Sequence, residues 1–157
     1  MKHRKDKFLL GVFLGILMVT MAVLSGCGAK AEPKPDPGSG KYLIYYLNSS
    51  LTKLVAQEYE TETKDQADLA EELMDQLLHV PRDLDCQPAV NEKVSFKTCR
   101  IDEQVLYLYF DGSYISMKPE QEILCRAALA RTMTQIPGID YISIYRGDQP
   151  LMDRQGN

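Results

Sequence analysis

Residues 93–110, KVSFKTCRIDEQVLYLYF, are the stretch that decides the expected fold. β-Branched and aromatic residues are frequent in both halves, and Asp102-Glu103 lies between them, so residues 93–101 and 104–110 are predicted to form a β-hairpin. Successive side chains of a strand point to opposite faces. The second strand therefore has an aliphatic face with Leu106, Leu108 and Phe110, and an opposite face with Val105, Tyr107 and Tyr109.

The strands on either side of residues 104–110 are expected to continue these two faces. In residues 93–101 one set of alternate side chains is assigned to the aliphatic face and the other to the opposite face: Val94, Phe96 and Thr98 against Ser95, Lys97 and Cys99. In residues 139–146 the aliphatic set is Ile142 and Ile144, and the opposite set is Tyr141, Ser143 and Tyr145. The sequence therefore predicts an open tyrosine face made of Tyr107, Tyr109, Tyr141 and Tyr145, with Tyr45 as a further candidate.

Two helices are predicted, one on each side of the hairpin along the chain. The first covers residues 63–79, where Thr63 and Gln66 have the spacing of a capping box, and Pro81 prevents its continuation. Its leucines recur every four residues, at Leu69, Leu73 and Leu77. The second covers residues 119–135, because Pro119 suits a first helical turn. Its apolar residues are Ile123, Leu124, Ala127, Leu129, Ala130 and Met133.

The order of these elements predicts the fold class. Two β-rich segments, residues 41–47 and 51–59, precede the first helix, so the order is β-β-α-β-β-α-β. A sheet with one aliphatic face buries that face against helices. We therefore expect an α+β two-layer sandwich, in which a mixed β-sheet carries two helices on one face and leaves the other face open.

The beginning of the chain resembles the signal of a bacterial lipoprotein. Four bases precede an apolar run of 16 residues, 8–23, which is shorter than the roughly 20 residues of a spanning helix. Leu24-Ser25-Gly26-Cys27 follows and resembles the lipobox. We expect residues 1–26 to be a cleaved signal peptide and Cys27 to carry a diacylglycerol and further acyl chains such as palmitate. An ordinary signal peptide or an uncleaved anchor are the alternatives.

Residues 27–40 are expected to be a flexible tether, and residues 41–157 to form one domain. Pro33, Pro35, Pro37 and a Gly-Ser-Gly end cannot bury apolar surface. Removal of the signal leaves 14 Lys and Arg against 21 Asp and Glu, a formal net charge of −7. Nucleic acid is not an expected partner, since phosphate binding depends on clustered Lys and Arg. The link to the membrane is expected to be the lipid anchor alone.

Three further cysteines belong to the expected domain. Cys86 and Cys99 flank a loop, so a disulfide between them is one alternative and isolated thiols are the other. Cys125 falls on the apolar side of the second helix and is expected to pack as a small hydrophobic residue. The sequence has no CxxC motif and no Cys/His cluster, so no metal site is expected.

Residues 42–152 resemble the GerMN domain of spore germination and sporulation proteins. The matching pieces are the first strand, ending at Tyr46-Leu47-Asn48, the helical AEELMDQLL, the hairpin ending at Asp111, and LARTMTQIPGIDYISIYRGDQPL. In the last piece, the positions that agree with the family pattern are Thr132, Ile136, Pro137, Gly138, Ile142 and Gly147. The segment Cys86-Gln87-Pro88 departs from the pattern, and relatives usually continue beyond the position of Asn157.

The resemblance implies a function through protein contacts. Related proteins lie on the outer face of the cytoplasmic membrane and act in spore envelope assembly, forespore engulfment and germination, and their fold is similar to that of ring-building domains. For this chain the resemblance implies the same location and a partner that is another envelope protein or a second copy. The tyrosine face is the surface expected to make that contact, since tyrosine is frequent in interfaces. High β-propensity alone also explains tyrosines on a half-buried sheet.

Residues that could perform catalysis are few. His79 is the only histidine after the signal, at the end of the first helix, where a cation interacts favourably with the helix dipole. No Ser or Cys nucleophile motif accompanies His79, and Asp111-Gly112-Ser113 is expected to be a turn. We expect no enzyme and no cofactor apart from the acyl chains on Cys27. Two classes of function remain: an interaction module, and an envelope lipoprotein that binds a small ligand or the cell wall in a concave site.

Overall fold

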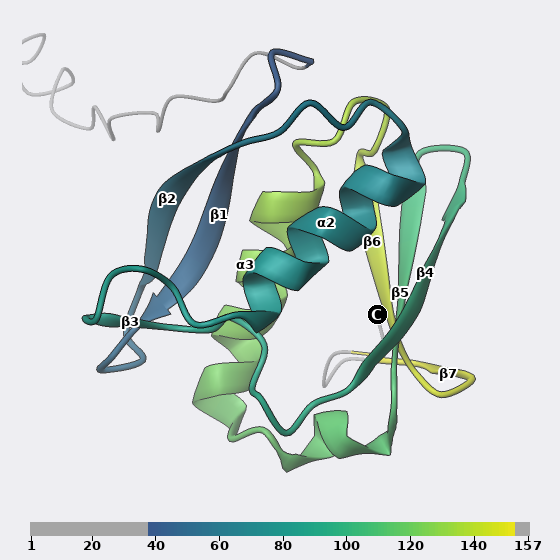
Figure 1. Cartoon of the computed structure of the whole chain (residues 1–157). Coiled ribbons are helices and arrows are strands. Elements are labelled where there is room, and N and C mark those ends of the chain that lie inside the picture. The colour runs from purple at the N-terminus through teal and green to yellow at the C-terminus, as the bar shows by residue number, and fades with distance from the viewer. Residues whose placement is uncertain (1–37, 153–157) are drawn as a thin grey trace, which may run out of the picture. The chain divides into compact units, whose positions relative to one another are not determined.

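The structure is a computed structural model that describes residues 38–152, except for the side chains of residues 115 and 116 (Figure 1). The expected signal peptide, the lipidation site Cys27 and most of the tether lie outside the described residues. All described residues belong to one compact unit, Lys34–Asn157. Within residues 38–152, no helix has the length and apolar character needed to cross a membrane.

The helices and longer strands of the described part follow each other in the expected order. Its elements are β1 (Lys41–Asn48), β2 (Leu54–Glu60), α2 (Gln66–Leu78), β3 (Cys86–Gln87), β4 (Phe96–Asp102), β5 (Val105–Phe110), the 3₁₀ helix η1 (Gly112–Ser116), α3 (Pro119–Met133), β6 (Tyr141–Arg146) and β7 (Gln149–Pro150). The two-residue strands β3 and β7 are additions to the predicted elements.

The strands form two sheets, with the orders β2-β1-β3 and β4-β5-β6-β7. The first sheet is antiparallel, and the second is mixed because β5 and β6 run parallel. Helix α2 contacts β1 and β4, helix α3 contacts β1 and β6, and Figure 1 shows both helices between the sheets. The α+β class, the two helices and the element order are confirmed. The difference is that the strands divide between two sheets, where one mixed sheet was expected.

The second edge of β1 explains this division. The side chain of Gln135 accepts a hydrogen bond from the Leu43 amide (2.8 Å) and donates one to the Leu43 carbonyl (2.8 Å). The hydroxyl of Thr132 accepts a hydrogen bond from the amide of Tyr45 (3.2 Å). Buried backbone groups need hydrogen-bond partners. Here the side chains of Thr132 and Gln135 and the short strand β3 supply these partners, and β1 pairs with no strand of the second sheet.

Both helices bury an apolar stripe, with local differences from the expected pattern. In α2, Leu69, Leu73 and Leu77 are buried as expected, but Asp65 caps the helix by accepting hydrogen bonds from the amides of Ala67 and Asp68. Thr63 and Gln66 therefore do not form the expected capping box, and Gln66 donates to the carbonyl of Pro137 (2.5 Å).

Helix α3 is rotated relative to the expected stripe. Ile123 is 68 % exposed, whereas the polar residues Gln121 and Thr132 are buried. The helix contacts strands of both sheets, so its buried surface is wider than one apolar stripe. Cys125 is fully buried, and its packing as a small hydrophobic residue is confirmed.

Strand β4 changes face at a β-bulge. The pairing with β5 shifts between Phe96 and Thr98, so that Cys99 lies opposite Leu108. Because a bulge inserts one extra residue, the alternation of faces reverses after it. As a correction to the expected faces, Cys99 packs against the core and Thr98 is exposed.

Candidate functional site

The tyrosine face lies on the outer side of the second sheet. In β5, Leu106, Leu108 and Phe110 are fully buried, whereas Tyr107 and Tyr109 are half-buried on the opposite side. The parallel pairing with β6 places Tyr109 beside Tyr145. The side chains of Tyr107 and Tyr109 therefore point to the outer face of the sheet, as the alternation in residues 104–110 predicts.

Three of the four predicted tyrosines are in ring contact. The ring of Tyr145 lies 5.1 Å from that of Tyr109 and 6.0 Å from that of Tyr107, measured between centroids. On the other side, the guanidinium of Arg100 in β4 lies 4.8 Å above the ring of Tyr107. Aromatic pairs and cation–π contacts of this geometry hold side chains in place. The result is a row of three tyrosine side chains on β5 and β6, with Arg100 of β4 at one end.

Tyr141 and Tyr45 lie apart from this row. Tyr141 is 65 % exposed at the start of β6, opposite Val105 in the register, so it borders the tyrosine face. Tyr45 belongs to the first sheet, is only 6 % exposed, and has the Arg131 guanidinium 4.3 Å above its ring. Tyr45 is therefore not part of the tyrosine face, because β1 belongs to a different sheet from β5.

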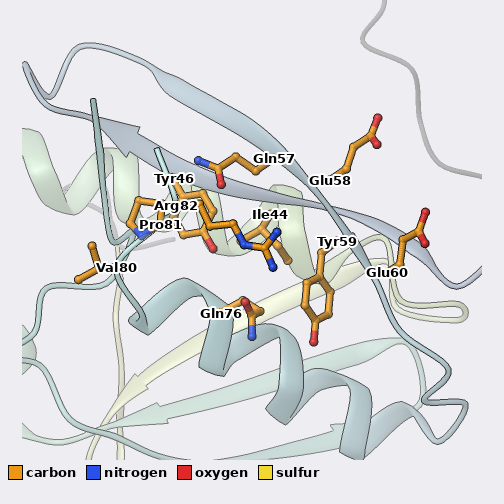
Figure 2. A pocket seen from close by; sticks show the side chains of 10 residues that line it. All are labelled: Ile44, Tyr46, Gln57, Glu58, Tyr59, Glu60, Gln76, Val80, Pro81 and Arg82. Carbon is orange, nitrogen blue, oxygen red and sulfur yellow. The ribbon is translucent and has the colours of Figure 1, made fainter. Parts of the chain in front are cut away.

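A groove that the sequence did not predict runs along β2. Its volume is about 450 Å³, and Figure 2 shows the ten side chains that line it: Ile44, Tyr46, Gln57, Glu58, Tyr59, Glu60, Gln76, Val80, Pro81 and Arg82. Ligand sites typically have volumes of about 300–1,000 Å³. The groove brings β1 and β2 together with the end of α2 and the residues that follow it.

Arg82 is the one cation that lines this groove, and it has no ion-pair partner in the described part of the chain. Figure 2 shows its side chain among the other lining residues, while the carboxylates of Glu58 and Glu60 point away from it. Burial raises the pKa of Tyr46, and the nearby charge of Arg82 opposes that rise. The guanidinium thus lies close enough to Tyr46 to influence its ionisation.

Tyr59 closes one end of the groove through a bond to α2. Its hydroxyl donates to Oε1 of Glu72 over 2.5 Å. This hydrogen bond and burial raise the pKa of Tyr59 to about 12, whereas hydrogen bonds from Thr63 and Tyr59 lower the pKa of Glu72. The pair joins the β1–β2 hairpin to the helix and leaves neither group free for a ligand.

Cys86, Cys99 and Cys125 are free thiols, so the disulfide considered between Cys86 and Cys99 is not formed. The physical reason is that Cys86 is paired with β1 of the first sheet and Cys99 with β5 of the second. Burial raises the pKa of all three thiols, which keeps them in the less reactive protonated form.

The expected catalytic candidates have structural positions. His79 is the C-terminal cap of α2, and its Nδ1 lies 2.6 Å from the carbonyl oxygen of Asp75. Asp111 caps η1 through the amide and hydroxyl of Ser113, which lower the pKa of the carboxyl. Among residues 38–152, no group of three or more His, Cys, Asp and Glu residues is arranged to hold a metal ion.

Residues 43–152 match the family model named Germane, described as "Sporulation and spore germination". No curated protein matches the chain. Among solved structures, the first GerMN domain of the sporulation protein GerM from Bacillus subtilis is similar, with a TM-score of 0.59 and 14% sequence identity, over 71% of this chain and 85% of that one.

Two further solved structures have a similar fold. The tandem GerMN domains of the same Bacillus subtilis protein match with a TM-score of 0.59 and 14% identity, over 72% of this chain and 41% of that one. A putative lipoprotein from Clostridium perfringens matches with a TM-score of 0.50 and 18% identity, over 76% and 82% of the two chains. At these identities the likeness establishes the fold, and the matched family model establishes the relationship.

Proposed function

Because this chain belongs to the Germane family of sporulation and spore germination domains, we propose that it is a lipid-anchored interaction module of the cell envelope. It acts in sporulation or germination on the outer face of the cytoplasmic membrane. Its tyrosine face binds another envelope protein or a second copy of the chain. The observation that carries this proposal is the contiguous row of Tyr107, Tyr109 and Tyr145 on a sheet face that no other described helix or strand covers.

The chemistry of the tyrosine face suits a protein contact. Tyrosine provides a large contact area with only two rotatable side-chain bonds, and the rings of the row already support each other, so little side-chain freedom is lost on binding. Arg100 adds a cation next to an aromatic ring, and tyrosine and arginine are both enriched in the energetically dominant residues of interfaces. No nucleic acid partner is part of the proposal, because the domain is acidic.

The anchor in this proposal is Cys27, with its diacylglycerol and acyl chains. Each methylene buried in the bilayer contributes roughly 0.8 kcal/mol, so two or three chains give stable attachment. The tether after Cys27 contains three prolines and allows the domain to reach partners beyond the lipid surface. The fold likeness to a putative lipoprotein is consistent with such an arrangement.

The tyrosine face is tested by crosslinking the tagged full-length chain in sporulating cells, with and without the double change Tyr107→Ser and Tyr145→Ser. Ile123→Ser is the matched control, since Ile123 is an exposed apolar residue away from the face. The double variant is expected to keep its folded circular-dichroism spectrum and lose its crosslinked partner, while the control keeps the partner. A folded double variant that retains every partner contradicts the proposal.

The anchor is tested separately by cell fractionation and fluorescence localisation of a Cys27→Ala variant. The unchanged chain is expected in the membrane fraction and at the forespore membrane during sporulation, and the variant is expected to lose both. A uniform membrane signal in growing cells favours a general envelope role over one in sporulation.

A further inference from the structure

The outer edge of β2 is a free strand edge. Among the described strands, β2 is the last of its sheet and pairs with β1 alone. Within residues 38–152, no hydrogen bond from another strand or from a side chain reaches the backbone of residues 54–60 on that side. An unpaired strand edge presents a row of amide and carbonyl groups that another extended chain is able to pair with.

The groove lies against this edge. Four consecutive residues of β2, Gln57 to Glu60, line it, although alternate side chains of a strand point to opposite faces. A lining that includes both sets is the pattern expected of a groove that follows the strand edge. Four residues of strand span roughly 13 Å, which is the length of a short extended peptide.

One buried polar atom of the groove wall has no partner among the described residues. This atom is Nε2 of Gln57. Tyr46 is only 5 % exposed, lines the groove, and lies close to the unpaired guanidinium of Arg82. A buried donor that lacks a partner costs free energy.

The charges around the groove leave the Arg82 guanidinium available to an anionic group. Glu60 forms an ion pair with Lys41 (3.0 Å), and Glu72 accepts the hydrogen bond of Tyr59. Figure 2 shows the carboxylates of Glu58 and Glu60 on the side away from Arg82. A guanidinium binds a carboxylate through two parallel hydrogen bonds. These acids at the rim disfavour ligands that carry several negative charges.

We propose that this groove binds the carboxyl-terminal end of an extended peptide, which pairs with the free edge of β2 and places its terminal carboxylate on Arg82. This site is separate from the tyrosine face, which belongs to the other sheet, and it goes beyond the proposed interaction module. The occupant is the C-terminus of a protein chain, since pairing along four residues of β2 takes an extended segment. Preference for free short peptides is the contrary outcome of the test.

The test is calorimetric titration of the full-length chain in detergent micelles with three probes: trialanine, N-acetyl-trialanine and N-acetyl-trialanine amide. The two probes with a free carboxylate are expected to bind, and the amide to bind at least 10-fold more weakly. Arg82→Gln is expected to weaken carboxylate binding by roughly 10- to 100-fold, since a hydrogen bond to a charged group is lost. Arg146→Gln, a matched change in β6 of the other sheet, where the guanidinium bonds to Gln149 (3.3 Å), is expected to leave binding unaltered.

Hydrogen exchange provides a second readout. Pairing of the peptide with β2 is expected to slow exchange of backbone amides in residues 54–60, which binding of a carboxylate to Arg82 alone does not do. Tighter binding of trialanine than of N-acetyl-trialanine identifies free peptides as the source, and the opposite order identifies a protein C-terminus. Absence of binding at millimolar concentration, equal affinity for the amide, an unaffected Arg82→Gln variant, or unchanged exchange in β2 each overturns the proposal.

Discussion

The two outer edges of the β1–β2 hairpin differ in how their backbone groups are satisfied. On the β1 side, Gln135 and Thr132 of the α3 region bond to the amides and a carbonyl of Leu43 and Tyr45. On the β2 side, the described residues offer no such partners, and a groove with an unpaired arginine lies there. One hairpin thus has two different edges: the satisfied edge joins it to the core, and the unsatisfied edge remains available for binding.

The largest effect is expected when Gln135 is replaced on the satisfied edge. Gln135→Leu removes the partners of both the amide and the carbonyl of Leu43, so the free energy of unfolding should fall by about 2–3 kcal/mol. Gln57→Leu on the open edge removes a donor that has no partner, so it should change that free energy by less than about 1 kcal/mol. Urea unfolding of both variants measures the difference, and equal losses would show that the two edges are equivalent.

A smaller effect is expected at Thr132, which has one bond to this edge. Thr132→Val keeps the shape of the side chain and removes the acceptor for the Tyr45 amide, which should cost about 1–2 kcal/mol in the free energy of unfolding. Thr134→Val is the matched control, because its hydroxyl bonds only to the exposed carbonyl of Ala130 and should cost well under 1 kcal/mol. Thermal or urea unfolding compares the two, and a control as damaging as Thr132→Val would rule out a special role for the β1 edge.

The smallest effect is expected at Tyr59, which ties the open edge to α2. Tyr59→Phe loses one partly exposed hydrogen bond and should destabilise the fold by about 1 kcal/mol or less near neutral pH. The consequence for pH dependence is more specific. The pKa of Tyr59 is raised from 10.0 to about 12 in the folded state, so the unfolded chain loses this proton first, and stability is lost as the pH rises through that interval.

The hydrogen bond between Tyr59 and Glu72 also affects stability at acid pH, because hydrogen bonds from Thr63 and Tyr59 lower the pKa of Glu72. The pKa of Glu72 is lowered in the folded state, so the unfolded chain binds a proton first as the pH falls below 4.5, and stability decreases there. Tyr59→Phe is expected to lose the alkaline decrease that Tyr59 causes and to weaken the acid decrease. Unfolding midpoints measured from about pH 3 to 11 check both effects. If the Tyr59→Phe variant loses as much stability at alkaline pH as the unchanged chain, Tyr59 is not the cause of that loss.

The local elements could be predicted from the sequence because short-range patterns produce them. The alternation in residues 104–110 gave the right core face of β5, and the four-residue spacing of leucines gave the right face of α2. Tyr107, Tyr109 and Tyr145 came together as expected, since β5 and β6 pair in register. These results depend on the pleat of a strand and the pitch of a helix, which the backbone imposes on any sequence.

Other features depend on contacts between distant residues. The β-bulge at Phe96–Thr98 reversed the face of Cys99, and contacts with both sheets rotated the buried side of α3 away from Ile123. The groove also escaped prediction, because its residues come from separated segments around Ile44, Gln57, Gln76 and Arg82. A polar residue such as Gln135 shows its role only when the edge that it satisfies is known.

The sequence alone therefore predicts the α+β class, the order of the elements, the aliphatic and tyrosine faces of β5, and the resemblance to GerMN domains. Contacts between distant segments were needed to show that the strands form two sheets and that Cys86 and Cys99 lie in different sheets. The same holds for the edge of β2 beside Arg82, which no other described strand pairs with. The physical reason is the distance along the chain between the interacting residues. Side-chain periodicity depends on near neighbours in the sequence, whereas the hydrogen-bond partners of a strand edge come from distant segments that meet only on folding.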